Sequence, residues 1–285
     1  MEEIIPAIVT PFIGSEEIDF NALKNYLYFL KRSGIEIVFS LGTTGEFNML
    51  TLQEKEEFIK KFRELSDLKV IFNVTENSLT NALKLARLAV EVSANGIASL
   101  PPVYHKPSSK GVITYFEELS KTGLPLFLYS YPDKVSIDFD TVKKLVSEGI
   151  IDGIKLTTDS LPLFRKYLEL KEINKSIKIY IGNDELVLFS LMIGGDGAIS
   201  AVANVAPEFM IKLVKLFKEG KITEALEVQK MVNKLNSVIT VGDYPSGVKV
   251  GLKYRGVYVG SVRKPLEEKM EENSLIYATL KELGL

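Results

Sequence analysis

An α/β fold, a (β/α)8 TIM barrel with a C-terminal helical extension, is predicted by two features of this sequence. Short β-rich apolar runs recur roughly every 20 to 35 residues, and amphipathic helical patterns lie between them. Strands that alternate with helices, without a second Gly-rich dinucleotide fingerprint, favour a closed barrel over an open doubly wound sheet. The eight predicted strands cover residues 4–10, 35–41, 70–74, 96–100, 125–129, 153–156, 177–182 and 197–200.

The helices are predicted from the spacing of their apolar residues and from their start signals. Residues 21–30 and 82–90 each carry apolar side chains three and four positions apart, which is the spacing of an amphipathic helix. Short polar side chains before such patterns can cap the first turn. The start signals are Asp19, Asp138 and the capping-box pair Thr51 and Glu54.

The chain continues with helical patterns after the eighth predicted strand. Segments from Pro207, Thr223 and Leu266 are predicted as helices, and no convincing strand follows them. No low-complexity linker separates these segments from the barrel. We therefore expect a barrel domain over residues 1–221 and a helical extension over residues 222–285 that packs on it.

Composition excludes several classes of function. The 285 residues are 46% hydrophobic and 25% charged, with a formal net charge of −2, so nothing indicates a nucleic-acid or anionic-membrane partner. With no cysteine and a single histidine, His105, the chain lacks a thiolate nucleophile, a histidine triad and a multi-histidine metal site. We expect neither a metal nor a cofactor.

The sequence predicts no membrane span and no signal peptide. No window contains about 18 uninterrupted apolar residues, and the first residues lack a basic segment followed by a long apolar one. A cytoplasmic location is the expectation.

Lys155 is the first candidate for chemistry. It lies at the carboxyl end of the apolar run 150–156, and in a barrel the carboxyl ends of the strands build the active face. Apolar surroundings lower the pKa of a lysine, and the free amine can then attack a carbonyl carbon to form a Schiff base. The alternative is a rim lysine in an ion pair. Lys178 lies near the start of its predicted strand and Lys69 opens another, directly before residue 70, so both are expected at the opposite face.

The second predicted strand ends in a turn that can hold a carboxylate. Within residues 40–46, Thr43 and Thr44 supply hydroxyls, and Gly45 lets the backbone turn tightly beside amide N–H groups. The alternative is an ordinary Gly-rich turn whose hydroxyls are satisfied locally. Glu46 is expected to tie this turn together by accepting backbone hydrogen bonds.

Two tyrosines are candidates for proton transfer. Tyr129 ends the fifth predicted strand, one strand before Lys155, and Tyr104 follows the fourth strand. Each has the alternative of an amphipathic side chain that packs at the barrel rim. His105 is expected to be a loop or interface residue.

Taken together, these motifs resemble the class I, Schiff-base aldolases that include dihydrodipicolinate synthase, N-acetylneuraminate lyase and 2-keto-3-deoxygluconate aldolase. The resemblance implies that Lys155 forms the imine with pyruvate and that Thr43 and Thr44, with Gly45, hold the pyruvate carboxylate. It implies an acid/base role for Tyr129. The segments that carry the resemblance are 6–12, 42–46, 128–132, 153–155 and 194–200, and they span nearly the whole chain.

The resemblance extends to further residues and to the assembly. It implies that Ile199 borders the pyruvate pocket and that Tyr104 of a neighbouring subunit continues a proton relay through Thr43. Because members are usually dimers of dimers, a homotetramer is the expectation. An iminium on Lys155 would let the pyruvyl methyl lose a proton, and the resulting enamine would add to an aldehyde. Pyruvate and an aldehyde are therefore the expected small-molecule partners.

Departures from the family pattern concern the second substrate. Leu156 replaces a usual acidic residue, Ser130 a usual asparagine, and Val103 one tyrosine of a common pair. Lys134 stands where dihydrodipicolinate synthases place an arginine, and lysine offers charge without a bidentate fork. The pattern at Tyr131-Pro132 is nearer to keto-deoxy-sugar-acid aldolases.

We therefore expect a lyase that cleaves or condenses a 2-keto-3-deoxy sugar acid of the 2-keto-3-deoxygluconate type. One alternative is a 4-hydroxy-tetrahydrodipicolinate synthase, which condenses pyruvate with aspartate semialdehyde. A reaction like that of N-acetylneuraminate lyase also stays open. An alternative of another class is a non-catalytic 2-keto acid binding protein, against which the presence of Lys155 and Tyr129 argues.

Overall fold

The computed structural model describes residues 3–14, 16–268 and 270–285. Its eight-stranded sheet has the order β1-β10-β9-β8-β7-β6-β5-β4. A parallel bridge pairs Ala7, directly after β1, with Phe39 in β4. This strand order, with helices between the strands, is that of a (β/α)8 barrel, and it confirms the predicted fold class. The eight strands are β1 (Glu3–Pro6), β4 (Ile37–Ser40), β5 (Lys69–Asn73), β6 (Gly96–Ser99), β7 (Leu126–Ser130), β8 (Gly153–Leu156), β9 (Lys178–Ile181) and β10 (Gly197–Ser200).

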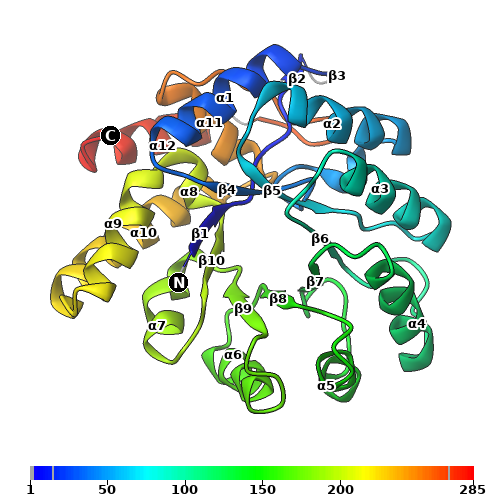
Figure 1. Cartoon of the computed structure of the whole chain (residues 1–285). Helices are drawn as coiled ribbons and strands as arrows, with labels where there is room; N and C mark the ends of the chain where they lie inside the picture. Colours follow the sequence, from blue (N-terminus) through cyan, green and yellow to red (C-terminus); the bar gives the residue numbers. More distant parts are fainter. Residues whose placement is uncertain (1–2, 15, 269) are drawn as a thin grey trace. The chain divides into compact units, whose positions relative to one another are not determined.

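The chain divides into two compact units, and the first covers residues 70–199. Consecutive strands from β5 to β10 pair in parallel within it, and Figure 1 shows the row of strands from β6 to β9 with helices α4, α5 and α6 along one side. These strands are almost fully buried, as expected for parallel strands with helical neighbours. Its helices are α3 (Leu79–Glu91), α4 (Ser109–Ser120), α5 (Phe139–Ser147), α6 (Leu161–Leu168) and α7 (Val187–Met192), with 3₁₀ turns η2 (Glu169–Glu172) and η3 (Asp184–Leu186).

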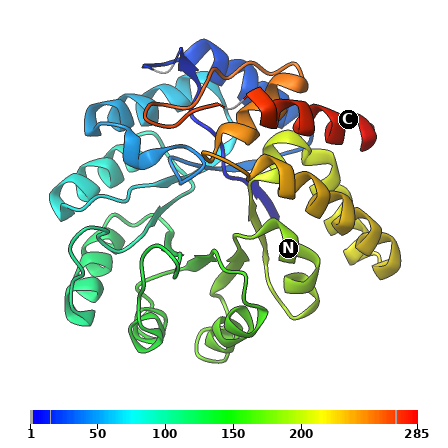
Figure 2. The same ribbon diagram turned by 180° about the vertical axis from the view of Figure 1, so that it is seen from behind.

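The second unit combines residues 3–69 with residues 200–285. It includes a short antiparallel hairpin, β2 (Phe12–Ile13) and β3 (Glu17–Ile18), which the sequence pattern did not predict. Helices α9 and α10 pack side by side, as Figure 2 shows in yellow and gold. The helices are α1 (Phe20–Arg32), α2 (Leu52–Leu65), α8 (Val202–Val205), α9 (Pro207–Lys218), α10 (Ile222–Ile239), α11 (Ser246–Tyr254) and α12 (Met270–Glu282), with the 3₁₀ turn η1 (Phe47–Met49).

The predicted helix starts are confirmed. Asp19 accepts the backbone N–H of Ala22 at the start of α1, and Asp138 accepts that of Thr141 at the start of α5. Thr51 and Glu54 form a complete capping box at α2. α10 begins at Ile222, and the division into domains at residues 221 and 222 stays a prediction.

The prediction of a helix from Leu266 is wrong by several residues. Leu266 donates its N–H to the carbonyl of Arg263, and Glu267 donates its N–H to Asp243 Oδ2 at 2.9 Å. These bonds hold the segment in a turn, and α12 runs from Met270, with residue 269 outside the described residues. The contact with Asp243 is long-range, so local periodicity could not reveal it.

Helix α11 was missed because it contains two glycines, which lower helix propensity. Both glycines allow close packing within this unit. A Cβ added to Gly247 would lie 2.5 Å from the carbonyl oxygen of Ile239, and one added to Gly251 would lie 2.9 Å from a methyl group of Val205. Tertiary packing therefore outweighs the propensity of these two positions.

Gly247→Ala is expected to lower the free energy of unfolding by about 1–3 kcal/mol, because the new Cβ meets backbone atoms that cannot rotate away. Denaturant melts of the variant and the parent chain measure the difference. Gly111→Ala in α4 is the control, since its Cβ would meet only side-chain atoms of Pro107 and Ser108. An equal or smaller cost at Gly247 than at Gly111 would contradict the packing argument.

Candidate active site

Lys155 lies in the middle of the 70–199 unit, on β8. Its backbone pairs in register with Tyr129 on β7 and with Tyr180 on β9. Residues that are paired across parallel strands carry side chains on the same face of the sheet, so the amine has a phenol ring as neighbour. The Lys155 Nζ lies 4.0 Å from the centroid of the Tyr129 ring. The strand register therefore brings the two leading candidates together.

The environment of Lys155 changes its acidity. The residue is only 4% exposed, and this burial removes water from the ammonium form. Desolvation lowers the pKa of Lys155 from the usual value near 10.5 to about 7, although the negative charge of the buried Asp184 opposes the shift. Free amine is therefore present near pH 7, where an exposed lysine is almost wholly protonated.

The other two strand lysines occupy different positions. Lys178 begins β9 and its Nζ forms an ion pair with Asp196 at 3.2 Å, while Lys69 begins β5 and is exposed. Both thus begin their strands, whereas Lys155 lies near the end of β8.

Tyr129 is held by aromatic packing. Its ring stacks on that of Tyr131 with a centroid separation of 6.2 Å and an interplanar angle of 22°, and the residue is 2% exposed. Burial raises the pKa of Tyr131, and the neighbouring Tyr129 adds to the shift. Ile199, on β10 of the same unit, is also buried.

Two predicted site residues lie at the surface of this unit. Tyr104 is 82% exposed, and its ring makes an edge contact with His105 at 5.2 Å. Its backbone N–H donates to Asn77 Oδ1 at 2.9 Å, which fixes the loop while the phenol stays in solvent. Lys134 is exposed in the turn that the Tyr131–Val135 bridge closes.

The threonine turn belongs to the second unit. Thr43 is half-buried and Thr44 is buried, and the Thr44 Oγ1 lies 2.7 Å from the Tyr244 hydroxyl. Thr10 Oγ1 donates to the carbonyl of Gly45 at 2.6 Å. Two threonines and a glycine thus occupy one turn after β4.

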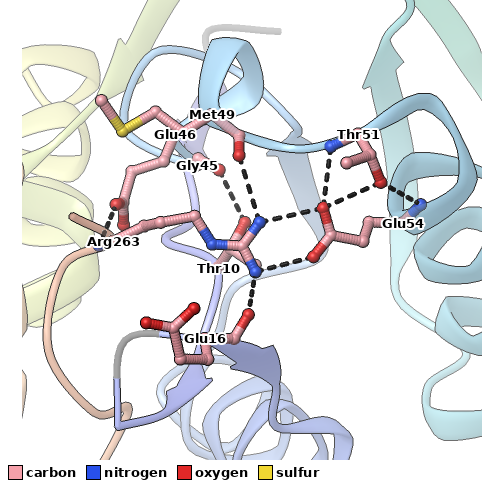
Figure 3. A network of polar contacts seen from close by, with 8 residues as sticks. All are labelled: Thr10, Glu16, Gly45, Glu46, Met49, Thr51, Glu54 and Arg263. Atoms are coloured by element: carbon pink, nitrogen blue, oxygen red, sulfur yellow. Dashed lines mark hydrogen bonds and ion pairs between the residues drawn. The ribbon is translucent and has the colours of Figure 1, made fainter. Parts of the chain in front are cut away.

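Glu46 closes this turn, and Figure 3 shows its surroundings. One carboxylate oxygen accepts the backbone N–H of Arg263 at 2.8 Å, as the sequence predicted for Glu46 in general terms. The other lies 2.7 Å from the Lys249 Nζ in an ion pair whose side chains are each 1% exposed. Desolvation lowers the pKa of Lys249 to about 8, against the opposing attraction of Glu46.

Arg263 links the turn to helix α2 in the same unit. Its guanidinium forms a fork with both oxygens of Glu54, at 2.7 and 2.9 Å, and also donates to the carbonyls of Met49 and Glu16 (Figure 3). The arginine bonds and the Thr51 bonds lower the pKa of Glu54 against the effect of its partial burial. Glu54 therefore serves both the capping box and the arginine.

Sequence reasoning missed several of these residues. Tyr180 lies in the predicted strand 177–182, and its position there was a signal for it, whereas Asp184 lies in an unpredicted turn after that strand. Tyr244, Lys249 and Arg263 contact the threonine turn from about 200 residues away in the sequence. A lysine between valines in an apolar helix was the one local signal for Lys249.

Comparisons with known proteins give the family. The model of the dihydrodipicolinate synthetase family matches residues 1–282. The chain belongs to this family. It is 32% identical to a 4-hydroxy-tetrahydrodipicolinate synthase of Methanococcus maripaludis, over all of this chain and 99% of that protein.

Solved structures agree with this membership. A prophage protein of the dihydrodipicolinic acid synthase family from E. coli K12, solved in complex with pyruvate, has a TM-score of 0.95 at 25% identity and is matched over 100% of this chain and 99% of its own. A variant of the 2-keto-3-deoxygluconate aldolase of Sulfolobus solfataricus has a TM-score of 0.90 at 30% identity, over 99% of this chain and 96% of its own. The resemblance stated from the motifs is thereby confirmed.

Family membership settles the class of the protein. It is an enzyme, a pyruvate aldolase of the lyase class whose members act through a Schiff base between pyruvate and a lysine. The expectation that it needs neither metal nor cofactor stays a prediction. Among the described residues, no helix has the length and hydropathy needed to cross a bilayer.

Proposed function

We propose that this enzyme reversibly cleaves a 2-keto-3-deoxy sugar acid of the 2-keto-3-deoxygluconate type to pyruvate and an aldehyde, with Lys155 as the Schiff-base residue. One observation carries the proposal. Lys155 is a buried lysine with a pKa of about 7, and its amine lies 4.0 Å from the ring centroid of a second candidate, Tyr129. A lysine in this state is a nucleophile at neutral pH.

The reaction follows from the free amine. The Lys155 Nζ adds to the C2 carbonyl of pyruvate, and loss of water leaves a protonated imine. This iminium withdraws electrons, so the C3 methyl group releases a proton and becomes an enamine carbon. The enamine adds to the aldehyde carbon, whose oxygen takes up a proton, and water then releases the 2-keto-4-hydroxy acid from Lys155. Cleavage is the same sequence reversed.

Separate residues are proposed for the proton and for the carboxylate. The Tyr129 phenol transfers the protons of imine formation and of the aldol step, since its ring lies 4.0 Å from the Lys155 amine on an adjacent strand. The Thr43 and Thr44 hydroxyls, with the backbone at Gly45, bind the pyruvate carboxylate, and Ile199 borders the methyl group. These roles extend the family pattern to the matching positions.

The residue at position 134 favours a sugar acid as the substrate. Lys134 offers a single exposed ammonium group, which cannot grip the second carboxylate of an amino-acid aldehyde with two parallel hydrogen bonds. The similarity to the Sulfolobus solfataricus enzyme is consistent with a sugar acid. The second candidate is 4-hydroxy-tetrahydrodipicolinate synthase, because the Methanococcus maripaludis relative carries that name at 32% identity.

Borohydride trapping tests the proposal. The protein is incubated with pyruvate, the imine is reduced, and the modified peptide is identified by mass spectrometry. We expect the reduced pyruvyl group on Lys155. A folded protein that gains no adduct on Lys155 would sink the proposed role of this residue. Pyruvate release from 2-keto-3-deoxygluconate, set against pyruvate consumption with aspartate semialdehyde, decides between the two substrates.

Tyr129→Phe is expected to lower kcat by about 10² to 10⁴-fold, because the variant keeps the ring beside the Lys155 amine and loses the acid/base group. Steady-state kinetics with the better of the two substrates measures this loss. Tyr167→Phe, which removes a hydroxyl bonded to Ser130, is the matched control and is expected to keep kcat within a few-fold. Equal losses in the two variants would contradict a chemical role for Tyr129.

The proposal includes a cytoplasmic homotetramer, a dimer of dimers in which Tyr104 of one subunit completes the proton relay of another. The 82% exposure of Tyr104 in the single chain is consistent with a side chain that a second subunit covers. Sedimentation of the active enzyme tests the assembly. A fully active monomer would refute the shared relay.

A further inference from the structure

The threonine turn has an unusual backbone, and it is held from outside by the C-terminal part of its own unit. Leu41 and Glu46, on either side of the Gly-Thr-Thr-Gly segment, have φ values of +57° and +56°. Non-glycine residues rarely adopt this left-handed region, so the surrounding contacts must maintain it. Gly45 is also confined, since an added Cβ would lie 3.2 Å from the carbonyl oxygen of Ile8.

Glu46 is anchored on the far side of the turn by charge. Its carboxylate is bound by the Lys249 ammonium and by the Arg263 backbone N–H. Lys249 in turn donates to the carbonyl of Ser261 at 2.8 Å and lies 4.3 Å from the centroid of the Phe12 ring. These contacts hold the end of the turn at Glu46. They do not involve the threonine hydroxyls, so other groups must orient those hydroxyls.

The Thr44 hydroxyl has a specific neighbour. Its Oγ1 lies 2.7 Å from the Tyr244 hydroxyl oxygen, a short hydrogen bond in which either atom can donate. A phenol is a stronger acid than an aliphatic hydroxyl and therefore the better donor. When Tyr244 donates, the single proton of Thr44 is directed to a different acceptor. A carboxylate is an acceptor only, so it needs a hydroxyl oriented in this way.

We propose that Tyr244 is a positioning residue for pyruvate: its phenol donates to Thr44 Oγ1 and thereby turns the Thr44 proton toward the pyruvate carboxylate. The inference rests on the proposed role of Thr44 in the reaction. It adds a residue from the loop between α10 and α11 to the substrate-binding machinery.

A double-mutant cycle tests this inference with pyruvate alone, so it does not depend on the identity of the aldehyde. The parent enzyme, Tyr244→Phe, Thr44→Val and the double variant are each trapped with borohydride over a range of pyruvate concentrations. Acetone, which lacks the carboxylate, is trapped in parallel. Tyr254→Phe, in which a ring that packs on Tyr277 loses its hydroxyl, is the matched control.

Tyr244→Phe is expected to raise the half-saturating pyruvate concentration about 10-fold, to leave acetone trapping unchanged, and to have no further effect in the Thr44→Val background. Unchanged pyruvate dependence in Tyr244→Phe, equal changes for acetone, or additive effects in the double variant would each overturn the inference. Failure of the proposed function is distinct, because the parent enzyme would then give no adduct at Lys155.

If Tyr244→Phe does not fold, the comparison of Thr44→Val with Thr44→Ser supplies the second test. Serine keeps the hydroxyl and its access to the Tyr244 phenol, whereas valine keeps only the shape. The inference requires that Thr44→Ser keep most of the pyruvate affinity of the parent enzyme and that Thr44→Val lose it. A Thr44→Val variant with the pyruvate affinity of the parent enzyme would show that the hydroxyl is not used.

Discussion

Lys155→Met is expected to abolish turnover and pyruvate trapping while it stabilises the folded protein near neutral pH. The loss of activity follows because methionine has no amine to form the imine, and we expect a fall in kcat of at least about 10³-fold. The gain in stability follows because Lys155 is charged in the unfolded chain, and its burial on folding disfavours that charged form. Methionine carries no charge to bury. Kinetics and denaturant melts of the same preparation measure both effects.

The pH dependence of the stability gain is fixed by the direction of the pKa shift. The unfolded chain keeps Lys155 protonated up to the usual pKa near 10.5, whereas the folded chain loses this proton at about pH 7. The unfolded state therefore binds more protons between these values, and the free energy of unfolding of the parent rises with pH across that window. Lys155→Met removes this slope, so its advantage is largest at and below pH 7, on the order of a few kcal/mol, and vanishes toward pH 10.5.

Lys178→Met is the matched control. Lys178 is also a strand lysine, but it is part-exposed and paired with Asp196. The control is expected to keep its activity and to change stability by less than about 1 kcal/mol. If Lys155→Met proved less stable than the parent at pH 7, the argument that burial of this ammonium destabilises the fold would be wrong.

Glu46→Gln is expected to lower the free energy of unfolding by about 3–5 kcal/mol, because it leaves the Lys249 ammonium buried without its anion. The double variant Glu46→Gln/Lys249→Met is expected to recover much of this loss, since it removes the unpaired charge. Denaturant melts of the parent, both single variants and the double variant measure the coupling.

A surface ion pair provides the contrast. Lys61 and Glu64 lie at 2.8 Å on α2 with largely exposed side chains, and Lys61→Met is expected to cost less than about 1 kcal/mol. Additive losses in the Glu46 and Lys249 variants would contradict a direct interaction between the two buried charges. A loss at Glu46 no larger than that at Lys61 would mean that the burial of the pair has little energetic effect.

The fold could be predicted from the sequence, and so could the proximity of Lys155 and Tyr129 in the 70–199 unit. Strand periodicity gave the order of the elements, and the position of Lys155 and Tyr129 at the ends of neighbouring strands placed them together, as the register of β7 and β8 now shows. Such inferences succeed because parallel pairing converts a position along one strand into a position in space.

The support of the threonine turn could not be predicted in the same way. Tyr244 and Lys249 reach the turn through tertiary packing, in a segment where Gly247 weakens the helical pattern. Tyr244 has no local signal, and the two valines that flank Lys249 indicate its burial without identifying its partner. Only the three-dimensional contacts identify the cation that neutralises Glu46.

Neighbouring side chains of β7 point to opposite faces of the sheet, so substitutions at positions 129 and 130 affect different contacts. Ser130 is fully buried and bonds through its hydroxyl to the Tyr167 hydroxyl of α6 at 3.2 Å, while the adjacent Tyr129 faces the Lys155 amine. Because neighbouring strand residues point to opposite faces, position 130 contributes to the seam between sheet and helix. The serine at position 130, where the resemblance leads one to expect asparagine, therefore acts on the contact between β7 and α6 and leaves the face that carries Tyr129 and Lys155 unchanged.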